Sequence, residues 1–300
     1  MKPISTTLFT FAAFLFSACT MNPATHPQAA KTKIDLENPA DNLSAFLKMR
    51  GNIDGSDTVM WWSGQIFAVI PQEKPALLFE FEGINVARLV HQPDGSWRML
   101  TREYAVYKDP RTGEILDRWQ NPYTKADVAV FNVQNDPVNS SFGSLGRDGK
   151  PRMLPLLEMG GDCILGFDVP LAYPNPISQE KFPEHSTGPT YTGSEHFGFY
   201  SRIDELSDPR LTSVPTFLAW FREGPWLPWM KMGQRPGLMV YSGYGKKLMG
   251  GIDEIPPAFL AHLRKQAPKY LSAPQEFLTP NATSWTVFLR EVLEPKSGGG

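Results

Sequence analysis

Residues 59–70, VMWWSGQIFAVI, open a series of short apolar or alternating segments that decides the fold. The series begins at Val59, and its later members are ALLFEF (76–81), INVARLV (84–90), SWRMLTREYAVY (96–107), ILDRW (115–119) and VAVFNV (128–133). Turn sequences such as QPDG, DPRTGE and NPYT separate these segments. Runs of this length, rich in β-branched and aromatic residues and closed by Pro, Gly and Asn, predict consecutive antiparallel strands joined by hairpins.

Three more strands are expected downstream, at EHFGFYSRI (195–203), VPTFLAWFR (214–222) and GLMVYSGYG (237–245). The Pro- and Gly-rich segment 137–192 before them should hold long loops and one short strand near 163–169. Eight to ten strands predict a mainly β fold, an antiparallel meander that forms a barrel or strongly curved sheet, lipocalin-like in outline. A short N-terminal helix is expected at 41–50, with Asp41 as N-cap, and C-terminal helices at 256–271 and 284–293.

Composition limits the class of protein. The chain has 300 residues, 41% of them hydrophobic, which suits a single β-rich domain at 36–294 followed by a disordered tail at 295–300. The formal net charge of -2 gives no electrostatic reason to expect nucleic acid as a partner, since that partner calls for a clustered basic surface. The sequence contains no GxGxxG, GxxxxGK[ST], GxSxG, HExxH or CxxC motif, and we expect neither a cofactor nor a metal site.

The first nineteen residues have the layout of a secretory signal: one Lys, an apolar run from Leu8 to Phe16, then small residues and Cys19. The end of this segment, FSAC, resembles a bacterial lipobox, which makes Cys19 the expected lipidation site. Residues 20–35 would then form a tether. We expect an exported protein on the periplasmic face of the outer membrane, with a soluble periplasmic protein as the alternative.

Cys163 is the second cysteine of the chain, so the mature protein has no partner for an intramolecular disulfide. In GGDCILGF it lies among apolar residues, which is typical of a small buried side chain and less typical of a nucleophile.

Polar and aromatic residues alternate on several of the predicted strands, and such faces either meet solvent or line a wet cavity. On 195–203, one face carries three candidates for acid–base chemistry and for stabilising an oxyanion; with a fourth on the next strand they are His196, Tyr200, Arg202 and Arg222. Aromatic and polar residues on neighbouring faces are candidates for ligand contact: Trp61, Gln65, Tyr104, Trp220 and Tyr244.

The segment PWLPWMKMG, residues 225–233, falls between two predicted strands and is expected to be a hairpin connection. Its two prolines restrict the backbone, and its aromatic and thioether side chains supply a large apolar surface. We predict a cap over the mouth of the barrel with Trp226 and Trp229 facing inward, either a plug or a lid in which Met230 also contacts the ligand.

Several segments in fixed order resemble the bacterial DUF1838 family: MRGNIDG, WWSGQIFAV, DRWQNPYT, NDPVN, GPWLPWMKMGQRPGLMVYSGYGKK and IPPAFLAHLRKQAPKYL. The similarity covers about residues 36–275. It implies an exported bacterial protein and assigns no catalytic residue.

Three hypotheses for function follow from these patterns. The first is binding of a small apolar molecule, aromatic or polycyclic, in the interior of a β-barrel. The second is a cofactor-independent isomerase, lyase or hydrolase that uses the same interior, with His196 and Tyr200 pointing inward. The third is a structural lipoprotein whose Trp- and Met-rich loop docks a protein partner of unknown identity.

Overall fold

The computed structural model describes residues 34–146 and 148–295, so Cys19 and the expected signal segment lie outside the described residues, as do residues 20–33 of the tether and most of the tail. The α-helices are α1 (Pro39–Arg50), α2 (Ile203–Leu206), α3 (Pro257–Gln266) and α4 (Ser284–Phe288). Short 3-10 helices are η1 (Pro228–Met230), η2 (Gly251–Glu254) and η3 (Pro268–Leu271), and η4 (Leu289–Leu293) is a π-helix. The strands are β1 (Thr58–Val69), β2 (Ala76–His91), β3 (Trp97–Lys108), β4 (Arg118–Gln120), β5 (Asp127–Ala129), β6 (Val133–Asn135), β7 (Ser140–Phe142), β8 (Leu156–Met159), β9 (Asp162–Pro174), β10 (Thr190–Arg202), β11 (Phe217–Gly224) and β12 (Leu238–Leu248).

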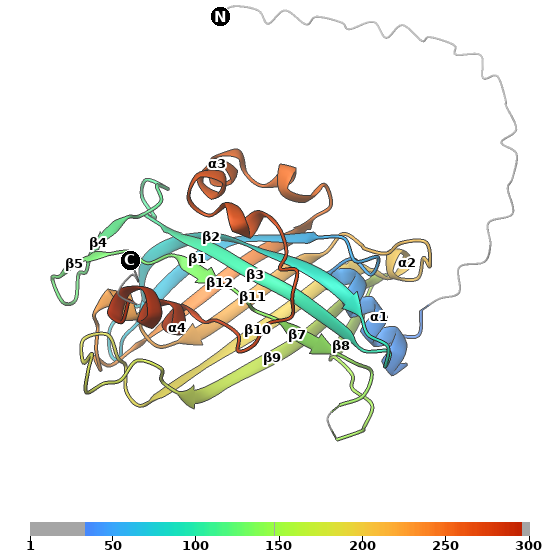
Figure 1. The fold of residues 1–300 in the computed structure, drawn as a ribbon, viewed down its shortest axis with the longest axis horizontal. Helices are drawn as coiled ribbons and strands as arrows, with labels where there is room; N and C mark the ends of the chain where they lie inside the picture. The colour runs from blue at the N-terminus through green and yellow to red at the C-terminus, as the bar shows by residue number, and fades with distance from the viewer. Residues whose placement is uncertain (1–33, 147, 296–300) are drawn as a thin grey trace, which may run out of the picture. The chain divides into compact units, whose positions relative to one another are not determined.

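Ten strands form one antiparallel sheet in the order β6-β3-β2-β1-β12-β11-β10-β9-β8, with β7 also paired to β3 (Figure 1). The first long strand therefore pairs with the last one, and each half of the sheet is a meander. The mainly β antiparallel class is confirmed. Within residues 34–146 and 148–295 no pairing joins the two ends of this order, so a closed barrel is not found and the lipocalin-like outline is not confirmed.

The sheet is strongly curved. Glu103 on β3 and Glu195 on β10 are separated by four strands, which would place them roughly 24 Å apart in a flat sheet. The charge of Glu195 nevertheless helps to raise the pKa of Glu103. Side chains of β2, β10 and β12 also share one core cluster, which includes Phe79, Tyr191 and Tyr241. The faces that carry these residues must therefore turn toward each other.

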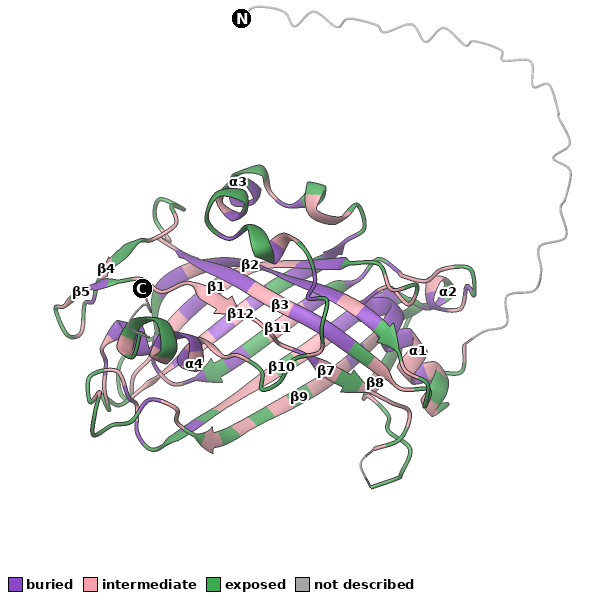
Figure 2. Ribbon diagram, in the orientation of Figure 1, coloured by how far each residue is buried: buried purple, intermediate pink, exposed green. Residues whose placement is uncertain are grey.

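We call the face that carries Met60, Trp62 and Phe79 the inner face, and the opposite one the outer face. Helix α1 covers one end of the inner face. Its Phe46 and Met49 pack there against residues of β9, β10 and β11. The 225–232 segment and α4 cover the other end. Helix α3 packs on the outer face of β1–β3, where Figure 1 shows it lying across the sheet. Figure 2 shows β2 and β3 largely buried, in contrast to β9.

Three local predictions need correction. The N-cap of α1 is Asn38, whose Oδ1 accepts hydrogen bonds from the amides of Ala40 and Asp41; Pro39 at the first helical position starts the helix earlier than expected and puts Asp41 in its first turn. The ILDRW and VAVFNV segments contribute β4 and β5, which form a separate two-stranded sheet.

The third correction concerns β9, which the sequence predicts as a short strand near 163–169. It runs from Asp162 to Pro174 and pairs with β10 along this length. On its other side β8 pairs only with residues 162–165 among the described residues, so the part that holds Pro170 and Pro174 lies at an edge. An edge strand tolerates proline because the missing amide has no ladder partner to lose.

Candidate functional site

The middle of the inner face is built on glycine. Gly64 pairs with Gly243 across β1 and β12, and Trp62 pairs with Gly245 on one side and Gly83 on the other. These four glycines lie on neighbouring strands of one face, where a strand normally presents side chains. The backbone is therefore open to close approach by whatever lies above it.

Aromatic rings cover these four glycines. A Cβ atom at Gly83 would lie 2.8 Å from the indole of Trp62, and one at Gly243 would lie 3.0 Å from Phe81 and 3.3 Å from Trp220. The rings therefore rest directly on the strand backbones. Trp62 and Trp220 both keep part of their surface exposed, although each contacts the core cluster at α1 and the one at the 225–232 segment. We call Trp62, Phe81 and Trp220 the aromatic floor.

An arginine cluster lies beside the aromatic floor. Arg222 of β11 is buried, donates a hydrogen bond to the Tyr191 hydroxyl and forms an ion pair with Glu195 at 3.3 Å. Its guanidinium lies over the rings of Tyr241, at 4.8 Å, and Trp285, at 5.8 Å. Burial raises the pKa of Tyr241 to about 12, so its hydroxyl stays protonated at neutral pH. The cluster thus joins one positive charge to one carboxylate and two phenols.

A second polar cluster centres on Glu103 of β3. Its carboxylate accepts a hydrogen bond of 2.5 Å from the Asn135 side chain. Arg50, at the end of α1, donates to Asn85 Oδ1 at 2.6 Å. Burial raises the pKa of Glu103; the Asn135 hydrogen bond lowers it, Glu195 raises it, and Arg50 and Arg222 lower it less. Burial also lowers the pKa of Arg50 to about 10, partly offset by Glu103. The two carboxylates and two arginines form one electrostatic unit on the inner face.

The structure brings five of the sequence-predicted site residues to the inner side of the sheet. Trp220 belongs to the aromatic floor and Arg222 to the adjacent cluster. The other three come from the 225–233 segment and are buried in the same core cluster: Trp226, Trp229 and Met230.

The other candidates lie on the outer face. His196 is about half exposed and bonds Asp168 and Ser194, and Tyr200 and Arg202 are exposed beside it. The expectation that His196 and Tyr200 point inward is wrong, because Glu195, Phe197 and Phe199 occupy the inner positions of β10. The structure does not bring His196 together with Arg222.

Four predicted ligand contacts share this outer placement. Trp61 donates to Glu82, and Tyr104 lies under α3 with its hydroxyl 3.0 Å from His262. Gln65 and Tyr244 are exposed on the same face. Sequence neighbours of Trp61 and Tyr104 lie on the inner side instead: Trp62 follows Trp61, and Glu103 precedes Tyr104. Phe81, on the neighbouring strand β2, lies on the inner side as well.

The 225–233 segment connects β11 to β12, as predicted. Both indoles are buried: Trp226 donates to the Arg235 carbonyl at 2.9 Å, and Trp229 contacts Phe79 and Tyr107. The inward orientation of the two indoles is therefore confirmed. Because their surfaces are already covered, they offer no exposed docking patch.

Cys163 is buried, and burial raises the pKa of its thiol to about 11. A protonated buried thiol supports the structural interpretation over a nucleophile. Among the described residues, no group of three or more His, Cys, Asp and Glu side chains could hold a metal ion.

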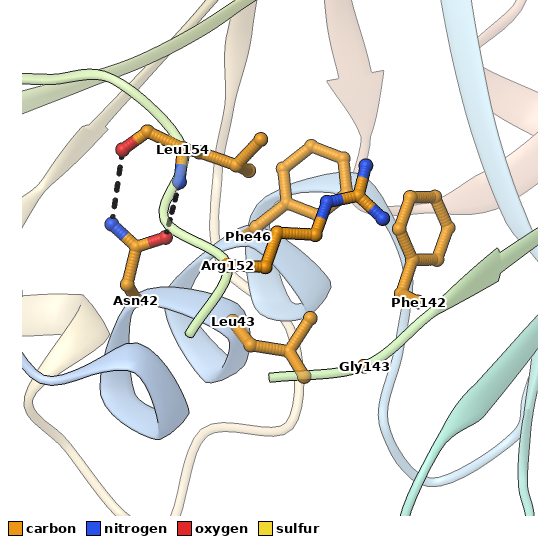
Figure 3. A pocket seen from close by; sticks show the side chains of 7 residues that line it. All are labelled: Asn42, Leu43, Phe46, Phe142, Gly143, Arg152 and Leu154. Carbon is orange, nitrogen blue, oxygen red and sulfur yellow. Dashed lines mark hydrogen bonds between the residues drawn. The ribbon is translucent and has the colours of Figure 1, made fainter. Parts of the chain in front are cut away.

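A small pocket lies between α1 and the segment 142–154 (Figure 3). Figure 3 shows Asn42 bonded to the Leu154 backbone, through a 3.2 Å bond to its carbonyl and a 3.0 Å bond from its amide. Because the Asn42 amide also donates to Leu36, its polar atoms are occupied. This contact fastens α1 to the segment, so we place the candidate site on the aromatic floor instead.

A family model described as protein of unknown function (DUF1838) matches residues 55–292. The chain belongs to the DUF1838 family. The match includes every strand of the sheet but not α1, which holds Arg50. No curated protein matches this DUF1838 chain. None of its helices between residues 34 and 295 is both long and apolar enough to cross a membrane.

Two solved structures show faint similarity to this DUF1838 protein. One is a complex of MucB with MucA(peri), at 6% identity, 81% coverage of this chain, 100% of that chain and a TM-score of 0.13. The other is the MucA/MucB complex of Pseudomonas aeruginosa, at 8% identity, 79% and 100% coverage and a TM-score of 0.12. At such TM-scores the similarity carries no argument about fold or function.

Proposed function

We propose that this DUF1838 protein binds a small apolar molecule, aromatic or polycyclic, against the aromatic floor. The observation that carries the proposal is the partial exposure of Trp62 and Trp220 between two well-packed core clusters. Indole rings resting on glycine backbones present flat apolar surface, which suits stacking with a flat ligand. Apolar walls with a few placed polar groups are typical of small-molecule sites.

The polar clusters support this proposal because they supply orientation. Arg222 and Glu195 lie beside Trp220 on β10 and β11, and Glu103 lies two residues from Ala105, the register partner of Gly83. Charged groups on an inner face are costly to bury, so their retention beside accessible aromatic rings favours a role in recognition over a role in packing.

A neutral fluorescent probe, N-phenyl-1-naphthylamine, tests the proposal. We expect saturable binding with one probe per chain, and we expect Trp220→Ala to weaken it by about tenfold, since lost stacking and apolar contact are worth about 1–1.5 kcal/mol. Phe217→Ala removes an aromatic side chain that is 64% exposed on the outer face, and it should leave the affinity unchanged. Absence of saturable binding, or equal loss in both variants, would reject the proposal.

We also propose that the protein is exported and anchored through a lipid on Cys19, on the basis of its signal-like residues 1–19. In a bacterial host, Cys19→Ser should abolish incorporation of radiolabelled palmitate and move the protein from the membrane fraction to the periplasmic fraction. Cys163→Ser is the matched control and should leave both unchanged. Palmitate labelling that survives Cys19→Ser would contradict the anchor.

A further inference from the structure

Three polar residues form a row on the inner face. Asn85 pairs with Glu103 across β2 and β3, and Glu103 pairs with Asn135 across β3 and β6. Adjacent strands place such partners about 5 Å apart on the same side of the sheet. Asn85 is two residues from Gly83, against which Trp62 rests, so the row lies about 7 Å along the sheet from the aromatic floor.

Two buried atoms lack a hydrogen-bond partner among the described residues, one on Arg50, which donates to this row, and one on Asn135, which belongs to it. Arg50 donates to Asn85 through Nη2, but its Nη1 is buried and unpaired. Asn135 donates to Glu103 through Nδ2, but its Oδ1 is buried and unpaired. Buried polar atoms are nearly always hydrogen-bonded. The unpaired donor belongs to Arg50, whose charge acts on Glu103, and the unpaired acceptor belongs to Asn135, which donates to Glu103, so the two atoms point to a bound group near this carboxyl.

The charges around these two atoms restrict what that group can be. Arg50 and Glu103 offset one another, and so do Arg222 and Glu195. The side-chain nitrogen of Lys247, on the Arg50 side, donates to the carbonyls of Lys48 and Gly51 and to Ser213 Oγ, and burial, with a smaller effect of Arg50, lowers its pKa to about 7. An anion would lie beside two carboxylates and a cation beside two guanidinium groups, so a neutral group is favoured.

We propose that Arg50 and Asn135 bind a neutral carboxamide-type group, a primary amide or a lactam, of a ligand whose apolar body lies on the aromatic floor. The amide carbonyl accepts from Arg50 Nη1, and the amide N–H donates to Asn135 Oδ1. This inference rests on the proposed binding function and adds the chemical class of the ligand's polar end. Donor–acceptor pairs of this kind discriminate strongly, because an analogue that lacks one half leaves a buried atom unpaired.

Displacement of N-phenyl-1-naphthylamine by three naphthalenes tests this inference. We expect naphthalene-2-carboxamide to bind at least tenfold more tightly than N,N-dimethylnaphthalene-2-carboxamide, which has no N–H, and than naphthalene-2-carboxylate, which is an anion. Equal affinities would assign the unpaired atoms to bridging water and overturn the inference, as would tightest binding of the carboxylate. If the probe itself fails to bind, the proposed function fails first.

Variants of Arg50 and Asn135 test the two proposed contacts separately. Asn135→Ala should reduce the carboxamide preference over the dimethyl compound to nearly onefold. Arg50→Met removes the donor to the carbonyl that both compounds carry, so it should weaken both by about the same factor, with folding checked by circular dichroism. Arg118→Met removes an exposed arginine of β4 and should keep the full preference. Asn135→Ala provides the test if Arg50→Met does not fold. A tenfold preference that persists in folded Asn135→Ala, or an unchanged affinity for both amides in folded Arg50→Met, would overturn the assignment.

Discussion

Replacing Trp226 by alanine should lower the free energy of unfolding by about 3–5 kcal/mol, the usual loss for a large buried aromatic side chain. Trp226 is 1% exposed, and its indole N–H donates to the Arg235 carbonyl. The ring also fills the space where a Cβ atom on Gly237 would come within 2.7 Å of Cζ2. Truncation therefore leaves a cavity and an unpaired carbonyl at the connection between β11 and β12. Urea unfolding followed by circular dichroism measures the loss.

Two further variants make this expectation specific. Trp226→Phe keeps most of the ring volume and loses the hydrogen bond, so its cost should be clearly smaller than that of Trp226→Ala. Tyr244→Ala removes an aromatic side chain that is 69% exposed on the outer face and should change stability by less than about 0.5 kcal/mol. A loss below about 1 kcal/mol for Trp226→Ala would mean that the 225–233 segment opens without disturbing the core, and the lid interpretation would replace the plug.

The strands could be predicted where burial requires long apolar or alternating runs of residues. VMWWSGQIFAVI, SWRMLTREYAVY and GLMVYSGYG each lie in a long strand, because one or both of their faces pack against other elements. The extent of β9 could not be predicted, because prolines usually indicate a loop. A strand tolerates them only at the edge of a sheet, and the edge position of β9 is known only from the structure. Whether the sheet closes was not predictable either, because closure depends on pairing between segments distant in sequence.

The candidate site was predictable only in part, because strand alternation does not say which face turns inward. On β10 the polar face of His196 and Tyr200 was the expected inner one, but Phe197 and Phe199 bury better and take that side. On β1 the same ambiguity led to the prediction of Trp61 as a ligand contact, whereas Trp62 is the residue on the inner face. A usable signal was present in Gly64, Gly83, Gly243 and Gly245, since glycines inside strong strands indicate close approach of another group.

Replacing Glu103 by glutamine should stabilise the protein at neutral pH, by about 1 kcal/mol or more. Burial raises the pKa of Glu103 above its unfolded value of 4.5, which means that the folded state prefers the protonated carboxyl. The stabilising contribution of that proton is complete below pH 4.5 and is lost as the pH rises through the folded-state pKa. Glutamine mimics the protonated form and can still accept from Asn135, so the variant keeps this contribution at every pH.

The expected signature is a difference between variant and wild type that depends on pH. Urea unfolding at pH 4 should give nearly equal stabilities, and unfolding at pH 7.5 should favour Glu103→Gln, whereas Glu73→Gln, at an exposed carboxylate, should show no such trend. A residue that destabilises its own fold at working pH is retained for another reason, and acidic groups held in this state are typical of functional sites. If Glu103→Gln instead weakened the fold at pH 7.5, the ion pairing with Arg50 and Arg222 would outweigh burial, and Glu103 would be a structural residue of the sheet.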